Sequence, residues 1–251
     1  MCTLVLLRRP GHAWPLLIAA NRDEMADRPW RPPGRHWPDR PEVFAGLDEL
    51  AGGSWLGIND HGVAAAILNR RNSLGPSPGL RSRGELVLDA LDHADAGDAA
   101  EALGALDAWA YRGFNLLVAD DRTAFWLRGG GRDGPRRPDR IAIPEGLSML
   151  TAYDLNDTAD PRIAWHLPRW RATPPPEPAT GDWSLWPDLL ASRDGGGEAR
   201  GAMTFRLPSG FGTVSSALIA ISERDVNDPA RPLMRFADGH PDSIRWRDLN
   251  P

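Results

Sequence analysis

Residues 1–24 read MCTLVLLRRPGHAWPLLIAANRDE, and this stretch predicts the first hairpin of the fold. Two apolar runs, TLVLL and LLIAA, flank a turn that contains Pro and Gly, a pattern typical of two β-strands joined by a turn. In an antiparallel hairpin the end of the second strand lies beside the start of the first. The pairing therefore brings Asn21, Arg22 and Asp23 next to Cys2, the only cysteine of the chain.

Strand and helix patterns recur in pairs along the rest of the chain. We expect strands at 54–60, 62–69, 114–120, 123–129, 140–144, 147–153, 210–222 and 232–237, and helices at 82–94, 99–110, 161–172 and 182–193. The five prolines between residues 25 and 41 exclude regular structure over most of that stretch. Strands that come in hairpins, with paired helices between them, indicate an α+β protein with antiparallel sheets covered by helices.

Length and composition restrict the class of protein. The 251 residues contain no internal repeat and no clear linker, so we expect a single domain over 1–251. The net charge of −5 offers no basic surface for nucleic acid. No apolar run approaches the roughly 20 residues of a membrane-spanning helix. A single cysteine excludes an internal disulfide, so we expect a cytoplasmic protein. One cysteine and six scattered histidines do not supply a zinc site.

Three of the candidate residues have a structural reading as well as a chemical one. Cys2 is either a small apolar residue of a buried strand or, once Met1 is removed, a thiol beside a free α-amine. Asn69 ends the second predicted hairpin, where it either terminates the strand or offers its side-chain amide to an oxyanion. Trp55 could line an apolar pocket, although aromatic residues near strands more often belong to the core.

An ordered set of short motifs gives the chain a resemblance to a known family. MCT, AANRDE, GGSWLGIND, RSRGELV and YRGFNL follow one another between residues 1 and 116, and GFGTVSSALIAI comes near the C-terminus. Together they resemble the NRDE family, also called the transport-and-Golgi-organization protein 2 family. That family is similar to the N-terminal-nucleophile (Ntn) hydrolases, and above all to the penicillin V acylase and bile-salt hydrolase group. The resemblance implies an α+β fold in which two antiparallel sheets form a four-layer αββα sandwich.

The resemblance also implies roles for single residues. Cys2 matches the nucleophile of the acylases, Asp23 matches the acid that contacts it, and Asn69 matches an asparagine of the oxyanion hole. Asn21 and Arg22 belong to the same motif, and we expect both of them, with Trp55, to contact the substrate. The planar guanidinium of Arg22 would suit a carboxylate or a phosphate.

Ala20 stands before Asn21 where the acylases have arginine, and two further positions depart from the family pattern. Ala152 follows Thr151 where the acylases have a second functional asparagine, and Val214 follows Thr213 where the wider family has arginine. Some of the polar side chains that would polarise the substrate are therefore missing. Their absence affects the expectation of hydrolase activity more than the expectation of the fold.

The sequence favours an enzyme, a cysteine hydrolase that acts on an amide (C–N) bond of a small acyl substrate. That chemistry needs the removal of Met1, because only then is the nitrogen of Cys2 a basic amine. No cofactor is expected for it. The alternative is a non-catalytic haem-binding or haem-trafficking protein of the same family, in which Cys2 or a histidine would be an axial ligand. The identity of the substrate and the oligomeric state cannot be read from the sequence.

Overall fold

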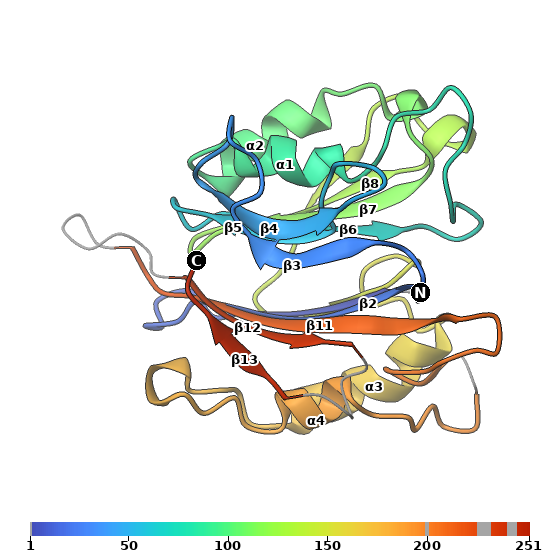
Figure 1. The fold of residues 1–251 in the computed structure, drawn as a ribbon. Coiled ribbons are helices and arrows are strands. Elements are labelled where there is room, and N and C mark those ends of the chain that lie inside the picture. Colours follow the sequence, from blue (N-terminus) through green and yellow to red (C-terminus); the bar gives the residue numbers. More distant parts are fainter. Residues whose placement is uncertain (1, 199–200, 225–231, 240–244) are drawn as a thin grey trace.

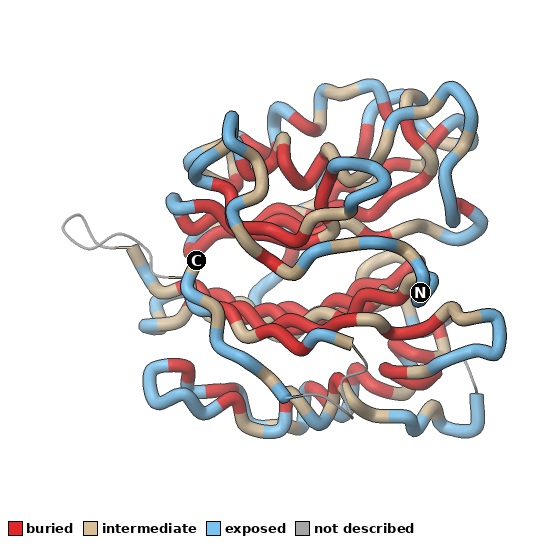
Figure 2. The backbone as a smooth tube through the Cα atoms, in the orientation of Figure 1, coloured by how far each residue is buried: buried red, intermediate tan, exposed pale blue. Residues whose placement is uncertain are grey.

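The protein folds into four layers, with two antiparallel sheets stacked face to face and helices on both outer faces (Figure 1). The computed structural model describes residues 2–198, 201–224, 232–239 and 245–251. The α+β, four-layer αββα sandwich that the resemblance implies is confirmed. The buried residues gather along the strands of both sheets and on the inner sides of the helices (Figure 2).

The first sheet carries the N-terminal hairpin. Within the described residues it has six strands, in the spatial order β10 (Gly146–Leu150), β1 (Thr3–Arg8), β2 (Leu16–Met25), β11 (Phe211–Ile221), β12 (Pro232–Asp238) and β13 (Arg247–Leu249). Its outer face is covered by α3 (Pro161–Ala172) and α4 (Trp186–Leu190).

The second sheet is built from consecutive strands. In the described part of the chain it has seven, in the order β3 (Trp30–Gly34), β4 (Val43–Asp48), β5 (Leu56–Asn59), β6 (Ala64–Asn69), β7 (Phe114–Ala119), β8 (Ala124–Gly129) and β9 (Asp139–Ala142). Its outer face is covered by α1 (Glu85–Leu91) and α2 (Ala96–Gly104).

Strand alternation divides the apolar side chains among three cores. In β2, Leu16 and Ile18 face the core between the sheets, whereas Leu17 and Ala19 face the helices α3 and α4. A third core lies between the second sheet and α1 and α2. Because β2 is buried on both faces, its first half, residues 16–20, is continuously apolar instead of alternating. The same alternation continues into the polar residues at the end of β2.

The predicted hairpin of β1 and β2 has the expected pairing. Thr3 lies opposite Asn21, which brings the end of β2 beside the start of β1. The polar segment that was expected to follow the strand is instead part of it, since β2 extends to Met25 and pairs on its other side with β11.

Several elements differ from the sequence expectation. β3 lies within the proline-rich stretch and is tolerated as an edge strand, with an irregular register between Arg31 and Gly34. β4 and the short β13 were not predicted. The strands expected at 140–144 and 147–153 do not pair with each other, because β9 joins β8 and β10 joins β1. The last predicted helix shortens to the five residues of α4.

Candidate active site

Cys2 lies just before β1, with its sulfur against the main chain of Asp23. The Asp23 N–H donates a hydrogen bond to Sγ at 3.3 Å, and the thiol donates to the Asp23 carbonyl oxygen at 3.5 Å. The residue is half-buried and packs against the core between the sheets. The hairpin register thus fixes the thiol beside the end of β2, as the sequence predicts.

The environment of Cys2 favours the neutral thiol. Burial, followed by the nearby Asp23 carboxylate, raises the pKa of the Cys2 thiol above its ordinary value. A buried sulfur next to a negative charge loses more by ionising than a solvated one. A thiolate at neutral pH therefore needs a base close to the sulfur.

The Asp23 carboxylate points away from the space between the sheets and into the layer of α3 and α4. Its Oδ1 accepts a hydrogen bond from Thr213 Oγ1 at 2.8 Å, and its Oδ2 accepts one from Arg162 Nη1 at 3.2 Å. The same Nη1 donates to Thr3 Oγ1 at 2.6 Å. The carboxylate is therefore held by residues from β11 and α3, and through Arg162 it is linked to the first residue of β1.

Arg162 is a site residue that the sequence analysis missed. It is the second residue of α3, whose first turn is capped by Asp160, which accepts a hydrogen bond from the Arg162 N–H at 2.9 Å. Its side chain is only 4% exposed. The available signal was an arginine on the same helix face as the buried residues His166 and Trp170, since a charged side chain on such a face needs a partner.

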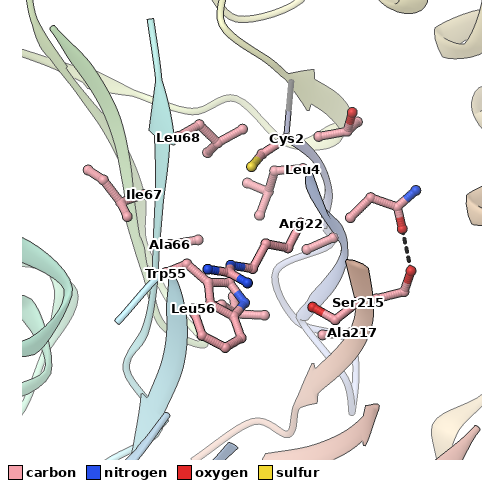
Figure 3. Close-up of a pocket in the computed structure, with 14 residues that line it drawn as sticks. Cys2, Leu4, Arg22, Trp55, Leu56, Ala66, Ile67, Leu68, Ser215 and Ala217 are labelled. Carbon is pink, nitrogen blue, oxygen red and sulfur yellow. Dashed lines mark hydrogen bonds between the residues drawn. The ribbon is translucent and has the colours of Figure 1, made fainter. Parts of the chain in front are cut away.

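Arg22 points to the opposite side of β2, into the space between the sheets. Its guanidinium carbon lies 4.2 Å from the ring centre of Trp55, which immediately precedes β5 in the facing sheet, and 5.7 Å from that of Trp30. Its Nη2 is 3.9 Å from Asp48 Oδ2. Burial lowers the pKa of Arg22. Figure 3 shows Cys2 and Arg22 extending from the first sheet towards Trp55, Ile67 and Leu68 of the second.

A cavity of about 480 Å³ lies next to Cys2 and Arg22. Cys2, Arg22, Asp23, Trp55 and Asn69 all contribute to its lining. The structure therefore brings five of the six predicted site residues to one cavity. Asn69 comes from the end of β6 in the second sheet, whereas Cys2 belongs to the first, so the cavity is lined by both sheets.

The amide of Asn21, the sixth predicted residue, is engaged in the helical layer. Its Nδ2 donates to the carbonyl oxygens of Leu190 and Met203, both at 2.9 Å, and its Oδ1 accepts from Ser216 Oγ. Asn21 is 1% exposed. The assignment of Asn21 to substrate contact stays a prediction.

One wall of the cavity is held in place by Arg83. Its Nη1 donates to the Ser73 carbonyl oxygen at 2.6 Å and to that of Gly113 at 3.1 Å. Burial, followed by the nearby Arg112, lowers the pKa of Arg83 to about 10. Arg83 therefore ties the segment that precedes α1 to Ser73 and Gly113.

Two of the positions that depart from the family pattern lie close to the Asp23 network. Ala152 is 1% exposed and follows Thr151, whose hydroxyl donates to Asp160. Val214 occupies an irregularity of β11, where the register with β2 shifts between Thr213 and Ser215. In this chain it is Arg162 of α3 that donates a hydrogen bond to Asp23.

The described residues offer no evident metal site and no spanning helix. Over 2–198, 201–224, 232–239 and 245–251, there is no group of three or more His, Cys, Asp and Glu side chains that could hold a metal ion. No helix in the same ranges is both long and apolar enough to cross a membrane. For haem, the cavity lining includes Cys2 and Met25, both of types that ligate haem iron, but no histidine from the described part of the chain.

Comparison with known sequences reveals a family relationship. The model of the family described as Transport and Golgi organisation 2 matches residues 1–134. The Transport and Golgi organization 2 homolog of Mus musculus is 36% identical over 125 residues, which are 45% of this chain and 41% of the mouse protein. The Bos taurus homolog is 39% identical over 115 residues, which are 43% of this chain and 40% of the relative. The matched region thus spans about two-fifths of these curated relatives.

Comparison with solved structures reveals a shared fold. A Caenorhabditis elegans ortholog of N-acylethanolamine-hydrolyzing acid amidase superposes with a TM-score of 0.54 and 11% identity, over 87% of this chain and 92% of that one. Penicillin V acylase from Agrobacterium tumefaciens gives a TM-score of 0.50 and 14% identity, over 99% and 86% of the two chains. At these identities the likeness concerns the Ntn-hydrolase fold alone.

Proposed function

The chain belongs to the Transport and Golgi organisation 2 family, and we propose that it is an N-terminal-nucleophile cysteine hydrolase that cleaves the amide bond of a small acyl substrate. The observation that carries the proposal is the position of the Cys2 sulfur. It is held by the main chain of Asp23 and lines the same cavity as Asn69 of the facing sheet. A nucleophile and an amide donor on two sides of one cavity are the minimum that acyl transfer requires.

The α-amine of Cys2 is the base in this proposal. Removal of Met1, which the small side chain of Cys2 permits, exposes an amine with a reference pKa of about 7.7 to 8.0, against about 8.5 for a free thiol. Because burial and Asp23 raise the pKa of the thiol, the thiolate forms only when an adjacent group takes the proton. An N-terminal amine is an established base of this kind.

The reaction has two stages. The Cys2 sulfur forms a bond to the substrate carbonyl carbon while the α-amine takes the thiol proton, and the side-chain amide of Asn69 donates to the oxyanion. The C–N bond then breaks, the leaving amine receives that proton, and an acyl thioester remains on Cys2. A water molecule attacks the thioester and loses a proton to the α-amine. The C–S bond then breaks, the carboxylic acid leaves, and the α-amine returns the proton to the Cys2 thiolate.

Asp23 and its partners fix the geometry of the base. The Asp23 carboxylate favours the protonated amine that forms during the attack. Its hydrogen bonds to Thr213 and Arg162 keep it from turning towards the cavity. Arg22 and Trp55 face the cavity, and we assign them to the substrate.

Mass spectrometry of the intact protein tests the proposal. The purified chain should lack Met1, and incubation with a panel of N-acyl amides should add the mass of an acyl group to the wild type. The Cys2→Ala variant should remain unmodified and inactive while it keeps the wild-type circular dichroism spectrum. A protein that retains Met1 in its native host, or acylation that survives Cys2→Ala, would refute the assignment.

Haem binding is the second candidate. The cavity that contains the Cys2 sulfur is also lined by arginines that could pair with propionate groups. Haemin titration of wild type and Cys2→Ala, followed by absorbance, separates the candidates. Stoichiometric binding that depends on Cys2, with no turnover of any amide, would favour the carrier over the hydrolase.

A single domain over residues 1–251 and a cytoplasmic location are also part of the proposal. The core between the sheets joins side chains from β1 to β12, which supports one folding unit. Limited proteolysis and cell fractionation would test these two expectations.

A further inference from the structure

Arg22 carries a buried hydrogen-bond donor that no described residue satisfies. Its side chain is 5% exposed, and among the residues that the structure describes, Nη1 has no hydrogen-bond partner. The Asp48 carboxylate is 3.9 Å from the other terminal nitrogen, which is too far for a hydrogen bond. A buried charged donor left without an acceptor is more unfavourable than a neutral donor in the same position.

The guanidinium of Arg22 is held in a fixed position. Arg22 lies in β2, where it pairs with Ser215 of β11 and directly follows Asn21, which pairs with Thr3 of β1, so its backbone is part of the sheet. The faces of Trp55 and Trp30 confine the guanidinium within the space between the sheets. Such a side chain is preorganised for a ligand, because little conformational freedom remains to be lost on binding.

The charge of the cavity agrees with an anionic ligand. Five arginines line it, against three carboxylates. One of the three, Asp23, turns its carboxylate away from the cavity and pairs it with Arg162. The protein as a whole has a net charge of −5. A positive cavity in an acidic protein attracts anions at that point of the surface.

We propose that the substrate that donates its acyl group to Cys2 also carries a carboxylate, and that Arg22 Nη1 binds this carboxylate. This rests on the proposed function, since it specifies the substrate of the same cavity. Cys2 and Arg22 both line the cavity of about 480 Å³, so a group bound at Arg22 belongs to the molecule that reaches the sulfur. Figure 3 shows both side chains extending from the first sheet towards the second. A carboxylate fits better than a phosphate dianion because Asp48 and Glu24 lie on the same lining and oppose a second negative charge.

Three amides with the same acyl chain test whether the ligand must be anionic and whether its anionic group is a carboxylate or a phosphate. N-octanoylglycine carries a carboxylate, N-octanoylethanolamine is neutral, and N-octanoyl-phosphoethanolamine carries a phosphate. Their dissociation constants are measured by calorimetry on the full-length Cys2→Ala protein, which cannot turn them over. The glycine amide should bind roughly 10- to 100-fold more tightly than the neutral amide, as expected for one hydrogen bond to a charged group.

Variants of Arg22 assign the preference to one side chain. In the Cys2→Ala background, Arg22→Gln should remove the preference for the glycine amide, and Arg22→Lys should restore part of it. Unchanged binding of the neutral amide shows that Arg22→Gln is folded. Arg31→Gln is the matched control. It removes an arginine that is 62% exposed and bonded to Glu49, and it should leave all three constants unchanged.

The outcomes separate this proposal from the hydrolase assignment. Equal or absent binding of the glycine and neutral amides, tightest binding of the phosphate amide, or a preference that survives Arg22→Gln overturns the carboxylate assignment. Turnover by wild type is measured separately. Hydrolysis of all three amides at equal rates would support the hydrolase assignment and contradict the carboxylate assignment. Tight Arg22-dependent binding of the glycine amide without hydrolysis would support the carboxylate assignment and contradict the hydrolase assignment.

Discussion

The guanidinium of Arg162 lies 3.2 Å from the Asp23 carboxylate, and the two side chains are 4% and 0% exposed. The pair joins α3 to the end of β2 directly behind Cys2, and Arg162 also donates to Thr3 at the start of β1. The stability of the fold and, in the proposed mechanism, the position of the base therefore depend on the same ion pair.

Replacement of Arg162 by Met should destabilise the protein by about 3–5 kcal/mol, because it leaves a buried carboxylate without its counterion. Urea unfolding followed by fluorescence measures the change. Arg136→Met is the control, since Arg136 is 69% exposed in its pair with Asp107 and its loss should have little effect. Equal midpoints for wild type and Arg162→Met would contradict the expectation.

The reactivity of Cys2 should depend on whether Met1 is present. In the form that retains Met1, burial and Asp23 raise the pKa of the thiol. Alkylation by iodoacetamide should then be slow at pH 7, and its rate should still be rising at a pH where an ordinary thiol has reached its plateau. The processed form should react faster at pH 7, because its amine accepts the proton. Identical pH–rate profiles would show that the amine is not the base.

Replacement of Asn69 by Ala should lower kcat by roughly 10²- to 10³-fold, the usual effect of losing one oxyanion donor. KM should change little, because the interaction forms in the transition state. The urea midpoint should also stay close to that of wild type, since Asn69 is half-buried at the end of β6. A rise in KM at constant kcat would instead make Asn69 a ground-state contact.

Asn21→Ala distinguishes a structural role from substrate contact. The Asn21 amide bonds two carbonyl oxygens in the layer of α3 and α4, and its loss leaves these acceptors buried. We expect a destabilisation of about 1–3 kcal/mol with kcat and KM nearly unchanged. A stable variant with a raised KM would support the contact that the family resemblance implies.

Acid should weaken the fold through His166. Burial lowers the pKa of His166 to about 4, below its value in the unfolded chain, so the unfolded state binds the proton more strongly. The free energy of unfolding is therefore unaffected by His166 protonation above about pH 6.5. It decreases as the pH falls from there to about 4, because the unfolded chain takes up the proton first. Denaturation midpoints of wild type and His166→Gln, measured from pH 7.5 to 4, should differ in their pH dependence. Parallel curves would exclude His166 as a source of acid sensitivity.

The sequence predicted best those features that depend on neighbouring segments. The β1–β2 hairpin and the meander through β5 and β6 follow from apolar runs that flank short turns. The helix α3 has the bounds expected from its periodicity. In these cases the local pattern and the tertiary structure agree.

Features that depend on distant segments escaped prediction. The extension of β2 through residues 21–25 requires β11, and the hydrogen bond from Thr213 to Asp23 joins positions 190 residues apart. β3 contains two prolines that a central strand would exclude, so only its place at the sheet edge explains it. The partner of Arg162 could not be predicted, because nothing in the local sequence says which strand α3 covers.

The alternation of side chains along β2 makes the NRDE segment sensitive to register. Arg22 faces the space between the sheets, and its neighbour Asp23 faces the helices. If β2 slipped by one residue against β1, the two charges would exchange sides. The carboxylate would then meet the tryptophans and a guanidinium would meet Arg162. A single-residue deletion in this strand should therefore be far more damaging than one in the turn that precedes it.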